Sequence, residues 1–187
     1  WVNDYADVLS NDQQQELDSM LKDFETATTN QIFVCIMQNL PAGTALEEYV
    51  NELFERWQPG QKDKDNGVLL AIFINDRKLR IEVGYGLEDK LTDADSKLII
   101  ANNIAPGFKQ GNYYQGIKNG IDKMMLTIKG DYKPQAKKAQ PSKPRSTSTR
   151  TGSDNPPMFA IIAFIWMIFV FIMILRNFLG RSGGWSY

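Results

Sequence analysis

Two stretches of the chain, residues 31–37 and 67–74, are apolar at almost every position. A strand that is covered on both faces has such a continuous apolar sequence, whereas a half-exposed strand alternates apolar and polar residues. The segment between them has helical periodicity, so the connection is a crossover and the two strands are predicted to be parallel. We therefore expect an α/β fold, a three-layer α/β/α sandwich around a small mixed sheet.

Periodic patterns on either side of these strands predict the remaining elements. Apolar residues at helical spacing predict four helices, at about residues 11–28, 44–57, 92–106 and 112–128. Ser10 and Gln13 have the spacing of a capping box at the first helix. Thr44 and Glu47 repeat this spacing at the second helix, and Thr92 is the expected N-cap of the third.

A third strand is predicted at residues 79–83, where apolar and charged side chains alternate after a short turn at 75–78. This strand is expected to be antiparallel to the second. The topology then places residues 63–67 beside residues 84–86, at the edge of the sheet opposite to the turn. Residues 1–5 are expected to form a strap packed over the domain.

Composition excludes several chemistries. The chain has no histidine, so catalytic pairs and metal sites that need an imidazole are absent. The sole cysteine, Cys35, lies within an apolar run and is expected in the core rather than as a nucleophile. Residues 1–132 carry 13 basic against 21 acidic groups, a net charge of −8, so nucleic acid is not an expected partner.

Residues 158–175 read MFAIIAFIWMIFVFIMIL, an uncharged apolar run of 18 residues. A helix of this length can cross the hydrocarbon core of a bilayer. The alternative is a buried central helix of a soluble protein. We predict a single-pass protein of the cell membrane, held in the lipid bilayer by this run.

The N-terminal domain is expected outside the cytoplasm, in the periplasm. The chain begins at Trp1 without a methionine, as a mature exported protein does. Five Lys and Arg residues lie within 137–156 and two follow the span, a bias that by itself favours the opposite orientation. An exported domain, however, is translocated largely regardless of such charges.

The segment before the span is rich in Lys, Pro, Ser and Thr, a composition that cannot bury enough apolar surface to fold. It is predicted to be a flexible tether, or alternatively to lie on anionic lipid headgroups. The expected organisation is an α/β domain at 1–130, a basic linker at 131–156, a transmembrane helix at 157–176 and a short glycine-containing tail at 177–187.

Oxygen-bearing groups gather at the predicted edge formed by 63–67 and 84–86. Carboxylates and carbonyls on loops are the ligands of Ca²⁺ and Mg²⁺, and glycines allow backbone carbonyls to approach an ion closely. The same residues also suit turns, a helix N-terminus and solvated surface. The candidate metal ligands are Asp63, Asp65, Asn66, Gly84, Gly86 and Asp93.

Short motifs throughout residues 1–128 occur in a characteristic order, among them Trp57-x-x-Gly60, Asn66-Gly67, Asp76-Arg77, Gly84-Tyr-Gly-Leu87 and Leu91-Thr-Asp93. In this order they resemble the TPM domain family. The resemblance implies a similar α/β fold, export, a following transmembrane helix with a glycine-rich tail, and frequent binding of divalent cations. The family residues implied here are Asn66, Gly67, Gly84, Gly86 and Asp93. The tail after Arg176 is shorter than in many relatives.

Two functions are consistent with these patterns. The first is a membrane-anchored extracytoplasmic accessory or scaffold domain that binds a divalent cation and contacts subunits of a membrane-protein complex. The alternative, implied by plant relatives associated with acid phosphatase activity, is a metal-dependent phosphomonoesterase that uses Asp93 or Asp65 as ligand or nucleophile. The residues themselves assign no catalytic group.

Overall fold

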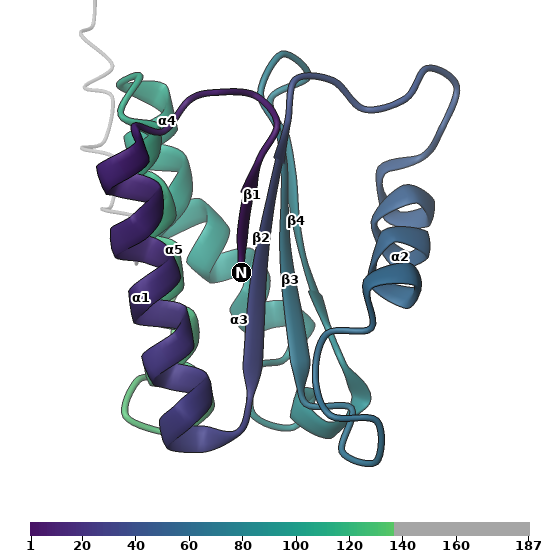
Figure 1. The fold of residues 1–187 in the computed structure, drawn as a ribbon, viewed down its shortest axis with the longest axis vertical. Helices are drawn as coiled ribbons and strands as arrows, with labels where there is room; N and C mark the ends of the chain where they lie inside the picture. Colours follow the sequence, from purple (N-terminus) through teal and green to yellow (C-terminus); the bar gives the residue numbers. More distant parts are fainter. Residues whose placement is uncertain (137–187) are drawn as a thin grey trace, which may run out of the picture. The chain divides into compact units, whose positions relative to one another are not determined.

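A computed structural model describes residues 1–136, which belong to one compact unit (Figure 1). The elements follow one another as β1 (Val2–Asp4), α1 (Asn11–Thr28), β2 (Gln31–Met37), α2 (Leu46–Trp57), β3 (Gly67–Phe73), β4 (Lys78–Val83), the 3₁₀ turn η1 (Tyr85–Leu87), α3 (Asp93–Ile99), the π-helix η2 (Ile100–Ile104), α4 (Ala105–Lys109) and α5 (Tyr113–Lys129).

The four strands form one mixed sheet in the order β1-β2-β3-β4. As predicted, β2 and β3 are parallel and β4 runs antiparallel to β3. The prediction of a strap at the N-terminus is wrong, because Val2–Asp4 pairs in parallel with β2 and extends the sheet. Three residues at an edge are too few to show the alternation by which a strand is found in a sequence.

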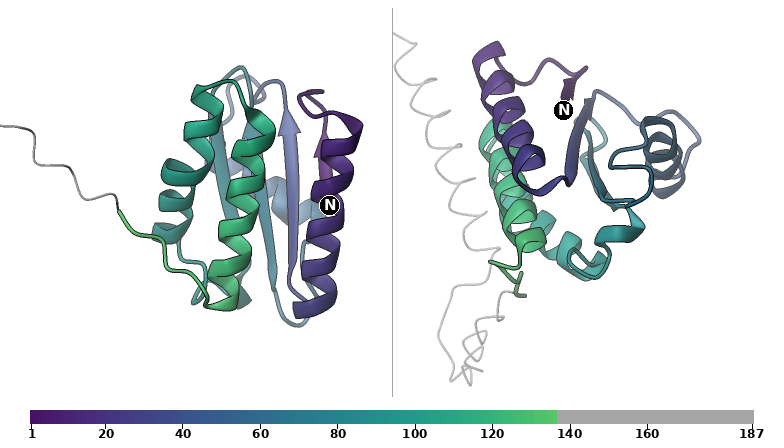
Figure 2. Two further views of the ribbon diagram at one scale, coloured as in Figure 1. Left: turned by 90° about the vertical axis from the view of Figure 1, so that its left-hand side faces the viewer. Right: turned by 60° about the horizontal axis from the view of Figure 1, so that its bottom comes forward.

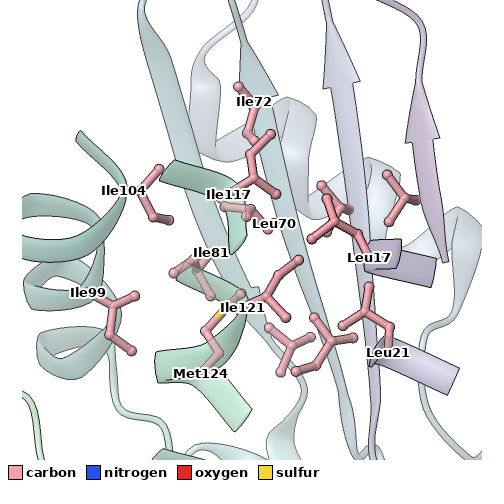
Figure 3. Close-up of a cluster of buried hydrophobic side chains, with 14 of the residues drawn as sticks. Leu17, Leu21, Leu70, Ile72, Ile81, Ile99, Ile104, Ile117, Ile121 and Met124 are labelled. Atoms are coloured by element: carbon pink, nitrogen blue, oxygen red, sulfur yellow. The ribbon is translucent and has the colours of Figure 1, made fainter. Parts of the chain in front are cut away.

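Helices cover both faces of the sheet (Figure 1). The helix α2 lies on one face, over a small core that includes Cys35, Leu69 and Phe73. On the other face, α1, α3 and α5 enclose the larger core, whose side chains Figure 3 shows. Figure 2 shows the arrangement of the helices on the sheet from two further directions. Its fully buried members include Leu17, Leu21, Leu70, Ile72, Ile99, Ile104, Ile117, Ile121 and Met124.

Two helix ends differ from the sequence prediction. The capping box at Thr44 does not form: α2 begins after Ala45, which has no side-chain cap. The third predicted helix does not stop at Pro106 but continues through the π turn η2 into α4. Pro106 lies in the first turn of α4, directly after the π turn, in which the N–H of Ala105 bonds to the carbonyl of Ile100.

The predicted transmembrane segment at 157–176 and the tail at 177–187 lie outside the described residues, as does most of the predicted linker. Within residues 1–136, none of the helices is both long and apolar enough to cross a membrane.

The first residues after α5 are packed against α3 and η2. The ammonium group of Lys133 donates to Asp95 Oδ2 at 2.8 Å, and Asn102 Nδ2 donates to the carbonyl of Gln135 at 3.0 Å. Pro134 between them is buried. Asp95 also accepts from the hydroxyl of Thr92, so one carboxylate completes the cap of α3 and holds the departing chain.

This arrangement predicts an acid-sensitive contribution to stability. Burial by itself raises the pKa of Asp95, but hydrogen bonds from Lys133 and Thr92 outweigh it and hold the pKa below its ordinary value. The stabilisation is therefore present above the unfolded-state pKa of about 3.9 and is lost as pH falls through the lower folded-state pKa.

We expect Asp95→Asn to lower the free energy of unfolding by about 1–2 kcal/mol at pH 7, since a buried charge-assisted hydrogen bond is lost. The difference from the unsubstituted protein should shrink as pH falls below about 4. Urea unfolding at a series of pH values measures it, with the exposed Asp93→Asn as the matched variant. A difference that does not change with pH would contradict this assignment.

Candidate functional site: a loop edge around Tyr85

The loops at residues 58–67 and 84–88 form one edge of the domain, which we name the Tyr85 edge. Gly84 N donates to Gly67 O at 2.8 Å, and Gly86 N donates to Asp65 O at 3.1 Å. The adjacency of residues 63–67 and 84–86 predicted from strand order is thus confirmed. The β3–β4 turn lies at the other end of the same two strands (Figure 1).

Gly84 and Gly86 allow the two loops to touch backbone against backbone, and Gly67 allows the first loop to fold closely on itself. A Cβ atom added at Gly67, Gly84 or Gly86 would lie well within 3.0 Å of a carbonyl oxygen, that of Pro59, Asp65 or Lys64 respectively. Real Cβ atoms essentially never approach so closely. Glycine at positions 84 and 86 therefore permits the close packing of the two loops.

The side chain of Asn66 fastens these loops to the rest of the domain. It is 4% exposed; its Oδ1 accepts from Gln61 N at 2.7 Å, and its Nδ2 donates to the carbonyl of Thr29 at 2.7 Å and to Asn30 Oδ1 at 3.2 Å. With amide oxygen and nitrogen both engaged, Asn66 has a structural explanation that does not involve an ion.

The three predicted aspartate ligands are exposed. Asp63 and Asp65 belong to the first loop, where Asp65 adopts a left-handed conformation with φ 46°. Asp93 lies in the first turn of α3 and pairs with Lys97 at 3.5 Å. Over residues 1–136, no group of three or more Asp, Glu, Cys or His side chains is placed to hold a metal ion.

Nucleophilic chemistry finds no support at Cys35. The thiol is 1% exposed, and burial raises its pKa to about 12. The thiol therefore stays protonated at neutral pH and acts as a small core side chain, as the sequence predicts.

Tyr85 is the most conspicuous side chain of this edge. It is 82% exposed, and the only other large apolar side chain exposed among the described residues is Tyr5, at 65%. Tyr85 lies between the two packed glycines, and the turn that carries it is anchored by Leu87, which is 1% exposed. The glycines of this loop predict a site from sequence, whereas Tyr85 itself is marked only as an aromatic residue between two glycines in a turn.

A cleft of about 380 Å³ adjoins Tyr85. It runs from the end of α2 along the first loop, and both polar and apolar groups line it: Phe54, Glu55, Gln58, Pro59, Gly60, Gln61, Lys62, Asp65, Gly84 and Tyr85. An exposed aromatic ring beside a polar cleft on a rigid backbone is an arrangement suited to recognition of another molecule.

The four-stranded mixed sheet with helices on both faces defines a small α/β domain whose rigid loop edge is its candidate site. The TPM domain profile matches residues 2–126, and the chain belongs to the TPM domain family. No curated protein matches the chain.

Three solved structures share the fold. The N-terminal domain of a P. gingivalis protein, determined by solution NMR, is 28% identical with a TM-score of 0.64, covering 74% of this chain and 87% of that one. The BA42 protein of the psychrophilic bacterium Bizionia argentinensis is 21% identical with a TM-score of 0.59, covering 70% and 88%. The N-terminal domain of the Corynebacterium glutamicum cg2496 protein is 14% identical with a TM-score of 0.54, covering 74% and 86%. Two of these are N-terminal domains in solution, so a domain of this kind folds without the remainder of its chain.

Proposed function

We propose that this protein is a membrane-anchored accessory domain that docks on a membrane-protein partner through the Tyr85 edge. The observation that carries the proposal is an 82% exposed tyrosine between two glycines, Gly84 and Gly86, whose backbone is packed against the neighbouring loop. Membrane attachment through residues 158–175 is part of the proposal and is supported by the length of the apolar run. The location of the domain outside the cytoplasm is a further part of the proposal.

The energetics of interfaces favour this role for Tyr85. Tyrosine supplies a large contact area with only two side-chain torsions to order, and it is enriched among residues that dominate binding energy. A rigid platform lowers the ordering cost further, because the loop conformation is already fixed before a partner arrives. The neighbouring cleft offers carbonyl, amide and charged groups for polar contacts around the ring.

A divalent cation belongs to the same proposal in a limited role. The exposed carboxylates of Asp63 and Asp65 lie on the first loop of the Tyr85 edge, where a Ca²⁺ or Mg²⁺ ion would complete its shell with water or with oxygens of the partner. We therefore propose that the cation acts at the interface rather than as a catalytic centre.

Site-specific photo-crosslinking tests the docking proposal. The full chain is produced in its own cells with p-benzoylphenylalanine at position 85 or, in the matched variant, at position 5, the other exposed tyrosine. We expect irradiation to give one adduct of defined mass from position 85 that contains an integral membrane protein. Repeating the irradiation of membranes with a chelator of divalent cations should weaken this adduct.

The adduct yield at position 5 distinguishes specific docking from crosslinking of any exposed side chain. Tyr5 is 65% exposed and lies outside the Tyr85 edge, so it should give no such adduct. Equal adducts at both positions, or none at position 85, would overturn the proposal. As a second readout, Tyr85→Ala should reduce co-purification of the crosslinked protein at least about tenfold, as expected for loss of a dominant interface residue. Tyr5→Ala should leave it unchanged.

A further inference from the structure

A second pocket lies at the other end of the sheet, between the β3–β4 turn and helix α4. Its volume is about 440 Å³, within the range of small-molecule sites. Half-buried apolar groups line it, among them Leu79, Phe108 and Tyr113. The rings of Phe108 and Tyr113 meet edge to face with their centroids 5.1 Å apart, so this wall of the pocket is held by aromatic packing.

The charge around this pocket has one sign. Arg77, Lys78 and Lys109 are exposed lining residues, and no lining residue is acidic. Among the ion pairs of residues 1–136, none involves these three cations. Arg77 is fixed in a left-handed conformation with φ 53°, and its N–H donates to the carbonyl of Ile74 at 3.2 Å. The turn therefore holds the backbone of Arg77 beside the pocket.

The helix α5 adds to the positive potential. Its first residue, Tyr113, lines the pocket, and the helix continues for 17 residues with no acidic side chain in its first turn. The N-terminus of such a helix carries a partial positive charge that favours a nearby anion. Three cations and a helix N-terminus thus surround an aromatic and aliphatic cavity, against the acidic charge of the domain as a whole.

We propose that this pocket binds a small amphiphilic anion, a carboxylate or phosphate that carries an acyl chain or an aromatic group. The apolar part occupies the cavity beside Leu79, Phe108 and Tyr113, and the anionic head lies among Arg77, Lys78 and Lys109. A free anion of this kind and the headgroup of an anionic lipid share this chemistry. The Tyr85 edge is at the opposite end of the sheet, so this site is independent of the proposed docking.

Amide NMR of residues 1–136 titrated with decanoate tests the site. We expect saturable shifts confined to residues 72–79 and 105–113. Decyl maltoside has the same alkyl chain but no charge, and its apparent affinity should be at least about tenfold lower than that of decanoate. Inorganic phosphate, which lacks the apolar part, should give only weak shifts at the cationic residues.

Two double variants that each remove two positive charges distinguish binding at the pocket from attraction of the anion by the overall charge of the domain. Arg77→Gln with Lys109→Gln removes two of the lining cations, and we expect decanoate binding to weaken by about tenfold, because each exposed cation contributes roughly a factor of three. Lys22→Gln with Lys90→Gln removes two exposed cations elsewhere and should leave binding unchanged. Shifts spread over the surface, no saturable shifts, or equal weakening in both pairs would overturn the proposal.

A second experiment identifies the source of the anion. The full chain is placed in nanodiscs of phosphatidylcholine alone or with phosphatidylglycerol, and the shifts of residues 72–79 are compared. Shifts that appear with phosphatidylglycerol and vanish in the Arg77→Gln, Lys109→Gln variant identify a bilayer lipid. Shifts that need added decanoate identify a free anion. If neither lipid nor decanoate changes these residues, the site does not exist.

Discussion

Replacement of Gly67 by alanine is expected to lower the free energy of unfolding by about 3–5 kcal/mol, a loss in the range of severe overpacking. A Cβ at this position would collide with the carbonyl oxygen and carbon of Pro59 and with Gly60 N. All these atoms belong to backbone, so no side chain can rotate away. The first loop of the Tyr85 edge would have to open between Pro59 and Gly67, and the first residue of β3 would move with it.

Urea unfolding followed by far-UV circular dichroism measures this change, and Gly43→Ala is the control. Gly43 has φ +81° and nothing within 4 Å of an added Cβ, so its substitution carries only the conformational cost of about 1 kcal/mol. At Gly67 the cost is steric rather than conformational, because an added Cβ clashes severely and φ is not positive. Equal losses in the two variants would show that the close approach of Gly67 to Pro59 contributes nothing to stability.

Because this prediction concerns the rigidity of the Tyr85 edge, it also bears on the proposed function. If Gly67→Ala folds at low temperature, the edge should be looser although Tyr85 itself is unchanged. Partner adducts from position 85 should then fall at least about threefold, since a mobile loop adds an ordering cost on binding. Gly43→Ala should leave the adducts at their original level.

The sequence predicts the sheet well because its signals are strong and local. Residues 31–37 and 67–74 are apolar at almost every position, and the structure places each of these strands between two others, with helices on both faces. Ser10 and Thr92 cap helices as expected, because their partner side chains lie three residues away. From these elements the meeting of residues 63–67 and 84–86 follows by topology alone.

The sequence predicts the candidate site less well because its features depend on tertiary contacts. Asn66 carries an amide oxygen that could bind a metal ion, but its hydrogen bonds to Gln61 and Thr29 form only in the folded loops and cannot be inferred from the sequence. Arg77 and Lys109 line the same pocket although they are far apart in the chain. Lys109 belongs to α4, which follows a π turn that no simple periodicity predicts.

The second large effect is expected for Asn66→Ala, about 2–4 kcal/mol of lost unfolding free energy, because truncation removes the three hydrogen bonds of a side chain that is only 4% exposed. The N–H of Gln61 and the carbonyl of Thr29 would each lose a bond of 2.7 Å. Neither group can be satisfied by a methyl side chain. Thermal or urea unfolding measures the loss.

Two matched substitutions separate the hydrogen bonds of Asn66 from any binding of a cation. Asn66→Asp keeps an acceptor for Gln61 N but replaces the donor to the Thr29 carbonyl with a second oxygen. Two acceptors then face each other, so most of the unfolding free energy that the Asn66 side chain contributes is lost. Asn75→Ala removes an exposed asparagine with one side-chain bond, to Asn39, and should cost less than about 0.5 kcal/mol. A structural Asn66 predicts the same losses with and without Ca²⁺. If Asn66 were instead a ligand, Asn66→Asp would bind Ca²⁺ more tightly and be stabilised by it, which would contradict the assignment made from the hydrogen bonds.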